Sequence, residues 1–129
     1  MNELDEKYQK TLAYMYAQLP MFTRIGSAAY KPNLNNTILR CEKLGNPHLQ
    51  FKSVHIAGTN GKGSTSNLMA VALQKAGYKT ALYTSPHIFD FRERIKINGQ
   101  DISKEFVIEV IEKNQHIINE VLPSFFELT

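Results

Sequence analysis

The chain has 129 residues, 43% of them hydrophobic, so it can fold around a core and is too apolar for a disordered chain. Its formal net charge of +3 is small and evenly spread, which argues against a nucleic-acid-binding protein and suits a small anionic ligand. A single cysteine, Cys41, excludes an internal disulfide and a cysteine-based metal site, and with no secretory signal or membrane-spanning run we expect a cytoplasmic protein that binds no membrane.

The first part of the chain is predicted to hold two helices and a loop. Apolar residues recur at spacings of three and four over residues 2–19, which predicts an amphipathic helix that Pro20 ends. Residues 21–36 are rich in glycine, proline and asparagine and predict a surface loop. A shorter helix is predicted over residues 37–44, with Gly45 as its C-cap.

The middle of the chain predicts a strand, a helix and a second strand. The strands are expected at residues 52–57 and 80–84, and the helix at residues 63–76, with Gly77 as its C-cap. Such an order predicts a βαβ unit, in which the two strands are parallel and the crossover is right-handed.

The last part predicts a hairpin and a final helix. Residues 95–102 read as two short strands around Asn98 and Gly99, a pair that suits a type I′ turn. Ser103 is a good N-cap for an apolar-striped helix that Pro123 ends. The predicted fold class is therefore α/β, with a parallel P-loop-type sheet core, a βαβ unit and an added hairpin.

A glycine-rich segment joins the first predicted strand to the helix. It reads V-H-I-A-G-T-N-G-K-G-S-T from Val54 to Thr65. Its glycines let the backbone bring N–H groups close to an anion, and the helix that follows points its positive end at the same place. Lys62 supplies a charge for the β- and γ-phosphates of a nucleotide. The predicted phosphate cradle consists of Gly58, Thr59, Asn60, Gly61, Lys62, Gly63, Ser64 and Thr65.

This segment departs from the general P-loop pattern G-x-x-x-x-G-K-[ST]. Ile56 stands at the first glycine position and Gly63 at the hydroxyl position, so Ser64 or Thr65 must supply the hydroxyl group for a phosphate oxygen or a magnesium ion. A glycine-rich turn that binds nothing is the alternative reading. Three glycines and a lysine at the start of a helix argue against it.

The variant H-I-A-G-T-N-G-K-G-S resembles the phosphate loop of the folylpolyglutamate synthases and dihydrofolate synthases, which belong to the Mur-ligase-like superfamily. Two further elements are similar to those of this family: Y-T-S-P-H at residues 83–87 with F-R-E-R-I at residues 91–95, and F-F-E-L-T at residues 125–129. Three motifs in order are far more specific than one loop. Together with R-I-G-S-A-A-Y-K-P-N-L and L-G-N-P, they extend the resemblance over nearly the whole chain.

The resemblance implies that residues 1–129 are the N-terminal portion of a Mur-ligase-type ATP-binding domain, whose remainder and C-terminal domain lie beyond this chain. It also implies an ATP-dependent ligase that adds L-glutamate to folate, to dihydropteroate or to both, through an acyl phosphate and with Mg²⁺. The full-length protein is then expected to be a monomer. The isolated fragment is expected to be inactive, and strand edges opened by truncation would favour its self-association.

The resemblance also implies roles for single residues. Lys62 would be catalytic, and Ser85 and Glu127 would be magnesium ligands. The alternative for Ser85 is a turn residue before a proline, and the alternative for Glu127 is a solvated surface carboxylate. Arg92 and Arg94 are read either as partners of a substrate carboxylate or as a solvated charge cluster. The residues expected near the pterin of the substrate are Ile25, Gly26, Pro86, His87 and Arg94.

Two other functions stay open at this point. The first is a Mur-type peptidoglycan ligase, against which Gly63 argues because those ligases usually carry serine or threonine directly after the lysine. The second is a P-loop module that binds a nucleotide without ligase chemistry, against which the S-P-H and F-E-L-T elements argue. The motifs do not separate folylpolyglutamate synthase from dihydrofolate synthase activity.

Overall fold

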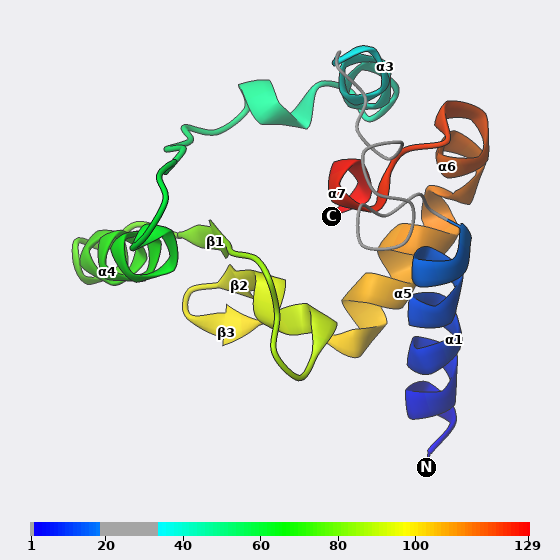
Figure 1. Ribbon diagram of the computed structural model, residues 1–129, viewed down its shortest axis with the longest axis horizontal. Helices are drawn as coiled ribbons and strands as arrows, with labels where there is room; N and C mark the ends of the chain where they lie inside the picture. The colour runs from blue at the N-terminus through cyan, green and yellow to red at the C-terminus, as the bar shows by residue number, and fades with distance from the viewer. Residues whose placement is uncertain (1, 19–33) are drawn as a thin grey trace. The chain divides into compact units, whose positions relative to one another are not determined.

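The computed structural model describes residues 2–18 and 34–129, which divide into two compact units (Figure 1). One unit, here the helical unit, comprises Met1–Lys52 and Ile108–Thr129, and the other, here the sheet unit, comprises Ser53–Val107. Among the described residues, no helix has the length and apolar character needed to cross a membrane.

The helical unit is built from short helices around an apolar core. They are α1 (Glu3–Gln18), α3 (Asn35–Lys43), a 3₁₀ turn η2 (Pro47–Leu49), the second half of α5 (Lys104–Lys113), α6 (Gln115–Val121) and α7 (Phe125–Leu128). The Tyr16 ring of α1 stacks on Phe125 of α7, with ring centroids 5.2 Å apart. The core side chains are Tyr8, Met15, Ile111, Ile117, Ile118, Val121 and Phe125.

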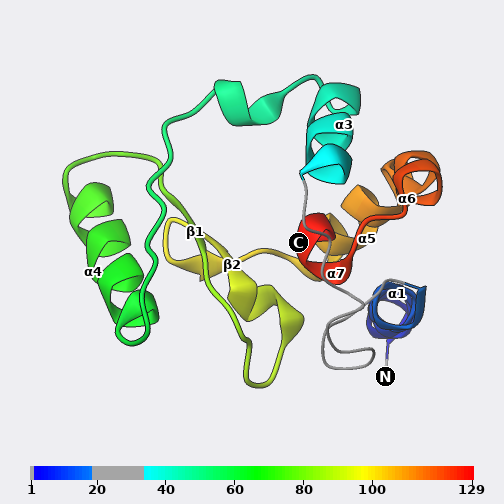
Figure 2. The same ribbon diagram turned by 45° about the horizontal axis from the view of Figure 1, so that its top comes forward.

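Polar contacts at the edge of this core join the same helices. Lys7 of α1 forms an ion pair with Glu112 of α5 at 2.9 Å. Lys43 of α3 forms one with Glu120 of α6 at 2.8 Å, and Figure 2 shows these two helices close together. Exposed pairs of this kind contribute about 0–1 kcal/mol each, so apolar burial carries most of the stability of the unit.

Both predicted glycine C-caps are present. Gly45 has a φ of 77° and donates its N–H to Glu42 O at 3.0 Å, while the next residue, Asn46, donates to Cys41 O at 2.7 Å. This is the Schellman arrangement, which satisfies two carbonyl groups at the end of α3. Gly77, with a φ of 88°, ends α4 (Lys62–Lys75) in the same way.

The final helix is broken where the sequence predicts a continuous one. Ser103 caps its start as predicted, since its Oγ accepts the Phe106 N–H at 3.1 Å. At Asn114 the backbone leaves the helical conformation, and the Asn114 side chain donates to Val110 O at 2.8 Å. Asparagine side chains compete with the backbone for such carbonyls, which accounts for the division into α5 and α6.

The sheet unit contains a small antiparallel sheet. Its strands are β1 (Ala81–Tyr83), β2 (Ile95–Ile97) and β3 (Gln100–Asp101), in the spatial order β1-β2-β3. Asn98 and Gly99 both have positive φ, at 49° and 80°, as a type I′ turn requires, so the predicted hairpin is confirmed. The Asn98 side chain also accepts the Thr80 N–H at 2.9 Å, which anchors the hairpin to the start of β1.

The predicted parallel βαβ unit is not formed by the described residues. Residues 52–57 form no strand, and Val54 is 66% exposed. The strand predicted at residues 80–84 exists as β1, but it pairs with β2 in the antiparallel direction. An apolar β-branched run indicates that a segment suits a strand, whereas a strand also needs a neighbour to pair with, and no described segment pairs with this one.

The helix predicted at residues 63–76 is present as α4 (Lys62–Lys75), and it contacts β1 (Figure 1). Ala70 is its only buried residue. Large apolar side chains of α4 are instead exposed, namely Leu68, Met69, Val71 and Leu73. These apolar side chains of α4 are therefore not covered within the sheet unit.

Candidate functional site

The glycine-rich segment enters α4 through a left-handed residue. Gly61 is the N-cap of the helix, with a φ of 76°, and its carbonyl accepts the first helical bond from the Thr65 N–H at 2.9 Å. A Cβ atom at Gly61 would meet nothing within 4 Å. The backbone conformation, and not crowding, is what favours glycine here, since a left-handed residue with a side chain costs roughly 1–2 kcal/mol.

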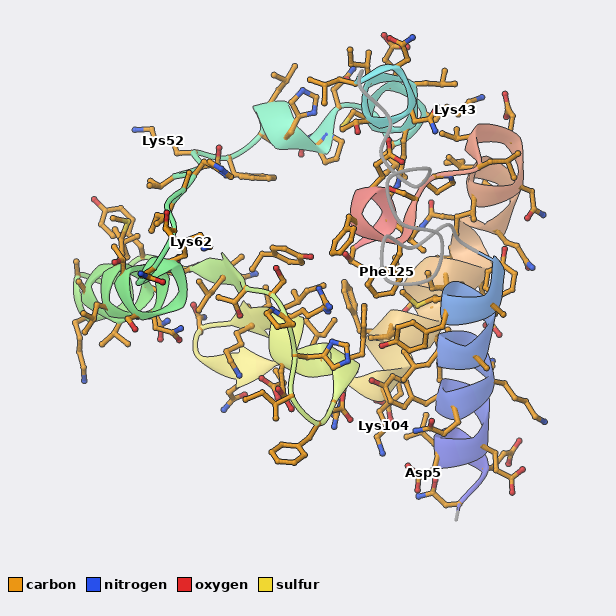
Figure 3. All side chains as sticks on the ribbon, viewed as in Figure 1. Asp5, Lys43, Lys52, Lys62, Lys104 and Phe125 are labelled. Atoms are coloured by element: carbon orange, nitrogen blue, oxygen red, sulfur yellow. The ribbon has the colours of Figure 1, made fainter. Side chains whose placement is uncertain are left out.

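Lys62 lies at the junction of this segment and α4, where Figure 3 labels it. Its side chain turns back over the segment, and Nζ donates to Gly58 O at 2.7 Å and to Thr59 O at 3.2 Å. The ammonium group is thus held beside the loop by exposed contacts to uncharged carbonyls. An anion that enters the loop would be a stronger partner, because its full negative charge attracts the ammonium group more strongly than a carbonyl dipole does.

The first turn of α4 has the features of an anion-binding helix end. No acidic residue lies in that turn, so no carboxylate competes for its N–H groups. Ser64 and Thr65 are exposed there. The side chains of Ser66 and Asn67, which sequence reasoning did not single out, bond back to the carbonyls of Lys62 and Gly63 at 2.8 Å each.

The S-P-H element forms the loop that follows β1. Ser85 and Pro86 are exposed, and the peptide bond between them is cis. His87 is half-buried, and its Nδ1 accepts a hydrogen bond at 2.8 Å from Nε of Arg94, which is 6% exposed. A guanidinium group only donates, so Nδ1 of His87 is the acceptor in this contact.

Both arginines of the F-R-E-R-I element are engaged within the sheet unit. Arg92 binds the carboxylate of Asp90 through Nε at 2.9 Å and Nη2 at 3.2 Å. Arg94 contacts His87 and, at 3.5 Å, the hydroxyl group of Tyr83. Arg94 therefore orients His87 in this structure. The prediction that Arg94 contacts a substrate stays a prediction.

Glu93 lies between these arginines and was missed by sequence reasoning. Its carboxylate accepts the backbone N–H groups of Ile88, Phe89 and Asp90 at 2.8–2.9 Å. The hydrogen bonds from Ile88, Asp90 and Phe89 lower the pKa of Glu93, as does the nearby His87, against an opposing effect of desolvation. The pattern of Asp90 followed three residues later by glutamate, a capping box, is the sequence signal that could have found it.

The two expected magnesium ligands lie in separate units. Ser85 belongs to the sheet unit, whereas Glu127 belongs to the helical unit and accepts the Ser124 N–H at 2.6 Å as part of the cap of α7. Within the described parts of the chain, no cluster of three or more His, Cys, Asp or Glu side chains could hold a metal ion. The donor types nevertheless fit, since Mg²⁺ prefers oxygen ligands and completes its shell with water and substrate phosphates.

Two of the expected substrate residues cannot be placed. Ile25 and Gly26 lie outside the described residues. The phosphate loop, from Gly58 to Thr65, and the S-P-H loop, with Ser85, Pro86 and His87, both belong to the sheet unit.

Comparison with known proteins gives consistent matches in sequence and in structure. Over 75 residues, 58% of this chain, it is 45% identical to the dihydrofolate synthase/folylpolyglutamate synthase of Bacillus subtilis, of which it covers 17%. The crystal structure of the folylpolyglutamate synthase of Thermotoga maritima matches 96% of this chain with a TM-score of 0.83 and 39% identity, and this chain covers 28% of it. No protein-family model matches the chain.

A solved complex of a folylpolyglutamate synthase (FPGS) with AMPPCP and folate also matches. It covers 94% of this chain with a TM-score of 0.81 and 28% identity, and this chain covers 30% of it. The chain thus spans less than a third of the length of each of these three similar proteins.

Proposed function

Since this chain belongs to the folylpolyglutamate synthase/dihydrofolate synthase family over the length that it spans, we propose that it is the phosphate-binding part of an ATP-dependent ligase that adds L-glutamate to folate or dihydropteroate. The observation that carries the proposal is the geometry of the phosphate loop. A left-handed Gly61 begins a helix whose first turn lacks acidic residues, and Lys62 lies over the loop. The FPGS complex with AMPPCP and folate supports both ligand classes.

In this proposal, the phosphates of ATP bind the N–H groups at the start of α4. Lys62 would leave Gly58 O and Thr59 O for the phosphate oxygens, since both present contacts are exposed and both acceptors are uncharged carbonyl oxygens. Ser64 and Thr65 would add hydroxyl groups from the same turn. This arrangement neutralises the phosphates and orients the γ-phosphoryl group for transfer.

The reaction we propose has two steps. A carboxylate oxygen of the folate or dihydropteroate attacks the γ-phosphorus of ATP, which releases ADP and leaves an acyl phosphate. The amine of L-glutamate then attacks the acyl carbon, and the resulting tetrahedral intermediate loses phosphate and a proton to give the amide. Both steps concentrate negative charge near the loop, where Lys62 and the backbone N–H groups stabilise it.

The Ser85 hydroxyl group is proposed to bind Mg²⁺, which would neutralise further phosphate charge. The pterin part of the substrate is proposed to bind near the S-P-H loop, beside Pro86 and His87. The exposed side chains of Ile88 and Phe89 in the same loop provide an apolar surface that suits a flat heterocycle.

We further propose that a longer protein completes the parallel sheet of a P-loop domain around residues 53–57 and α4. Support comes from the exposed apolar side chains of Val54, Leu68 and Val71, which such a sheet would cover. The isolated chain is accordingly proposed to bind phosphate weakly and to catalyse nothing.

The test of the phosphate cradle is a calorimetric titration of Mg-ATP into the chain and into Lys62→Ala. We expect the variant to bind at least about tenfold more weakly, a loss of about 1.4 kcal/mol, because the charged partner of the phosphates is gone. Lys75→Ala is the matched control, since Lys75 lies in the last turn of the same helix. Equal weakening by both substitutions, or none by either, would reject the cradle.

The test of the ligase chemistry uses the full-length protein. Incubation with ATP, glutamate and either dihydropteroate or tetrahydrofolate should give glutamylated product and ADP. ATP binding without glutamylated product would instead favour a nucleotide-binding module, and activity on a peptidoglycan precursor would favour a Mur-type ligase.

A further inference from the structure

The loop after β1 is held by one carboxylate. Three consecutive backbone N–H groups point at Glu93: that of Ile88 bonds Oε2 at 2.8 Å, and those of Phe89 and Asp90 bond Oε1 at 2.9 and 2.8 Å. Each bond is charge-assisted and therefore stronger than a neutral one. Together they fix the backbone of three successive residues.

Apolar packing does not hold the same residues. The side chain of Ile88 is 79% exposed and that of Phe89 is 92% exposed. Hydrophobic burial of Ile88 and Phe89 thus contributes little to the position of the loop tip, whose backbone is bound instead by Glu93.

The role of Glu93 goes beyond capping the start of a helical turn. In a capping box, the glutamate at the third helical position accepts the N–H of the N-cap residue, which here is Asp90 of the 3₁₀ turn η3 (Phe91–Arg94). The further bonds to Ile88 and Phe89 lie outside what such a cap requires. They connect the base of the turn to the exposed tip of the loop.

We propose that Glu93 is a positioning residue for the pterin-bearing substrate, because its carboxylate holds the backbone at residues 88–90 so that Ile88 and Phe89 stay presented beside Pro86. The role of Glu93 in substrate binding rests on the proposed function. The hydrogen bonds that fix residues 88–90 do not, since they are present in the free protein.

The experiment compares the full-length protein with Glu93→Gln, which keeps the size of the side chain but offers one acceptor oxygen and places an NH₂ group against the remaining N–H donors. Hydrogen exchange of the amides at residues 88–90 is measured without substrate, and steady-state kinetics are measured with each substrate varied. We expect exchange at least about tenfold faster and a KM for the pterin substrate about tenfold higher, with the KM for ATP and kcat little changed. Glu105→Gln, an exposed change of the same charge in the same unit, should alter none of these.

Unchanged exchange in Glu93→Gln would overturn the inference whatever the kinetics show. Faster exchange with an unchanged KM for the pterin substrate would overturn the positioning role and would count against a pterin site at this loop. A wild-type protein that forms no glutamylated product would fail the proposed function, while hydrogen exchange would still test the hold on the loop. If Glu93→Gln does not fold, as judged by circular dichroism, Glu93→Asp takes its place: it keeps the charge with a shorter reach, and we expect intermediate exchange and an intermediate KM.

Discussion

Arg94 and Arg92 lie two residues apart and differ in what surrounds them. Arg94 is buried and divides its guanidinium between His87 and Tyr83, whereas Arg92 is partly exposed and pairs with the neighbouring Asp90. The planar fork of arginine can serve two partners at once, while lysine offers a single ammonium group. Replacement of arginine by lysine should therefore lower the free energy of unfolding by different amounts at the two positions.

We predict that Arg94→Lys lowers the free energy of unfolding by about 1–3 kcal/mol, because the half-buried acceptor on His87 loses its donor and the ammonium group of lysine would lie in the buried site of the guanidinium group. Arg92→Lys is the control and should cost less than about 1 kcal/mol, as expected for a partly exposed ion pair. Urea denaturation with a common slope measures both. Equal losses would mean that Arg94 does not hold His87 in the way that the structure indicates.

Sequence reasoning reached some of these residues and not others, for a physical reason. The sequence could predict a phosphate cradle from Gly58 to Thr65 because a phosphate loop requires residue types at fixed spacing along the chain, and its role stays a prediction. The contact between Arg94 and His87 could not, because it joins residues on either side of a turn whose shape the pattern does not specify. Glu93 was within reach, since its bonds are local and follow a known capping pattern.

At the scale of elements, local signals predicted helices and turns well. The caps at Ser103, Gly45 and Gly77 and the turn at Asn98 and Gly99 were confirmed, because each depends on a few adjacent residues. The strand expected at residues 52–57 failed, because pairing depends on a partner that the segment itself does not specify. The break at Asn114 was missed because a stripe of apolar residues continues across it.

The start of α4 gives a prediction about its two glycines. Gly61→Ala should lower the free energy of unfolding by roughly 1–2 kcal/mol, because alanine would have to adopt the left-handed conformation of this N-cap. Gly63→Ala, two residues further on and inside the helix, should be neutral or stabilise by up to about 1 kcal/mol, since a Cβ there meets nothing within 4 Å and alanine is the better helix former. Thermal or urea unfolding without nucleotide measures both, and equal effects would contradict the assigned conformation of Gly61.

At the scale of the whole molecule, the exposed apolar surface of α4 distinguishes the isolated chain from the longer protein we propose. Leu68 is 73% exposed, so Leu68→Ser should change the free energy of unfolding of the 129-residue chain by less than about 0.5 kcal/mol. In the full-length protein, the same substitution should cost about 2–5 kcal/mol, because a parallel sheet packed on α4 would bury this side chain. The measurement is urea denaturation of both lengths, with and without the substitution. A small effect at both lengths would mean that α4 stays uncovered and that the proposed P-loop sheet does not form around it.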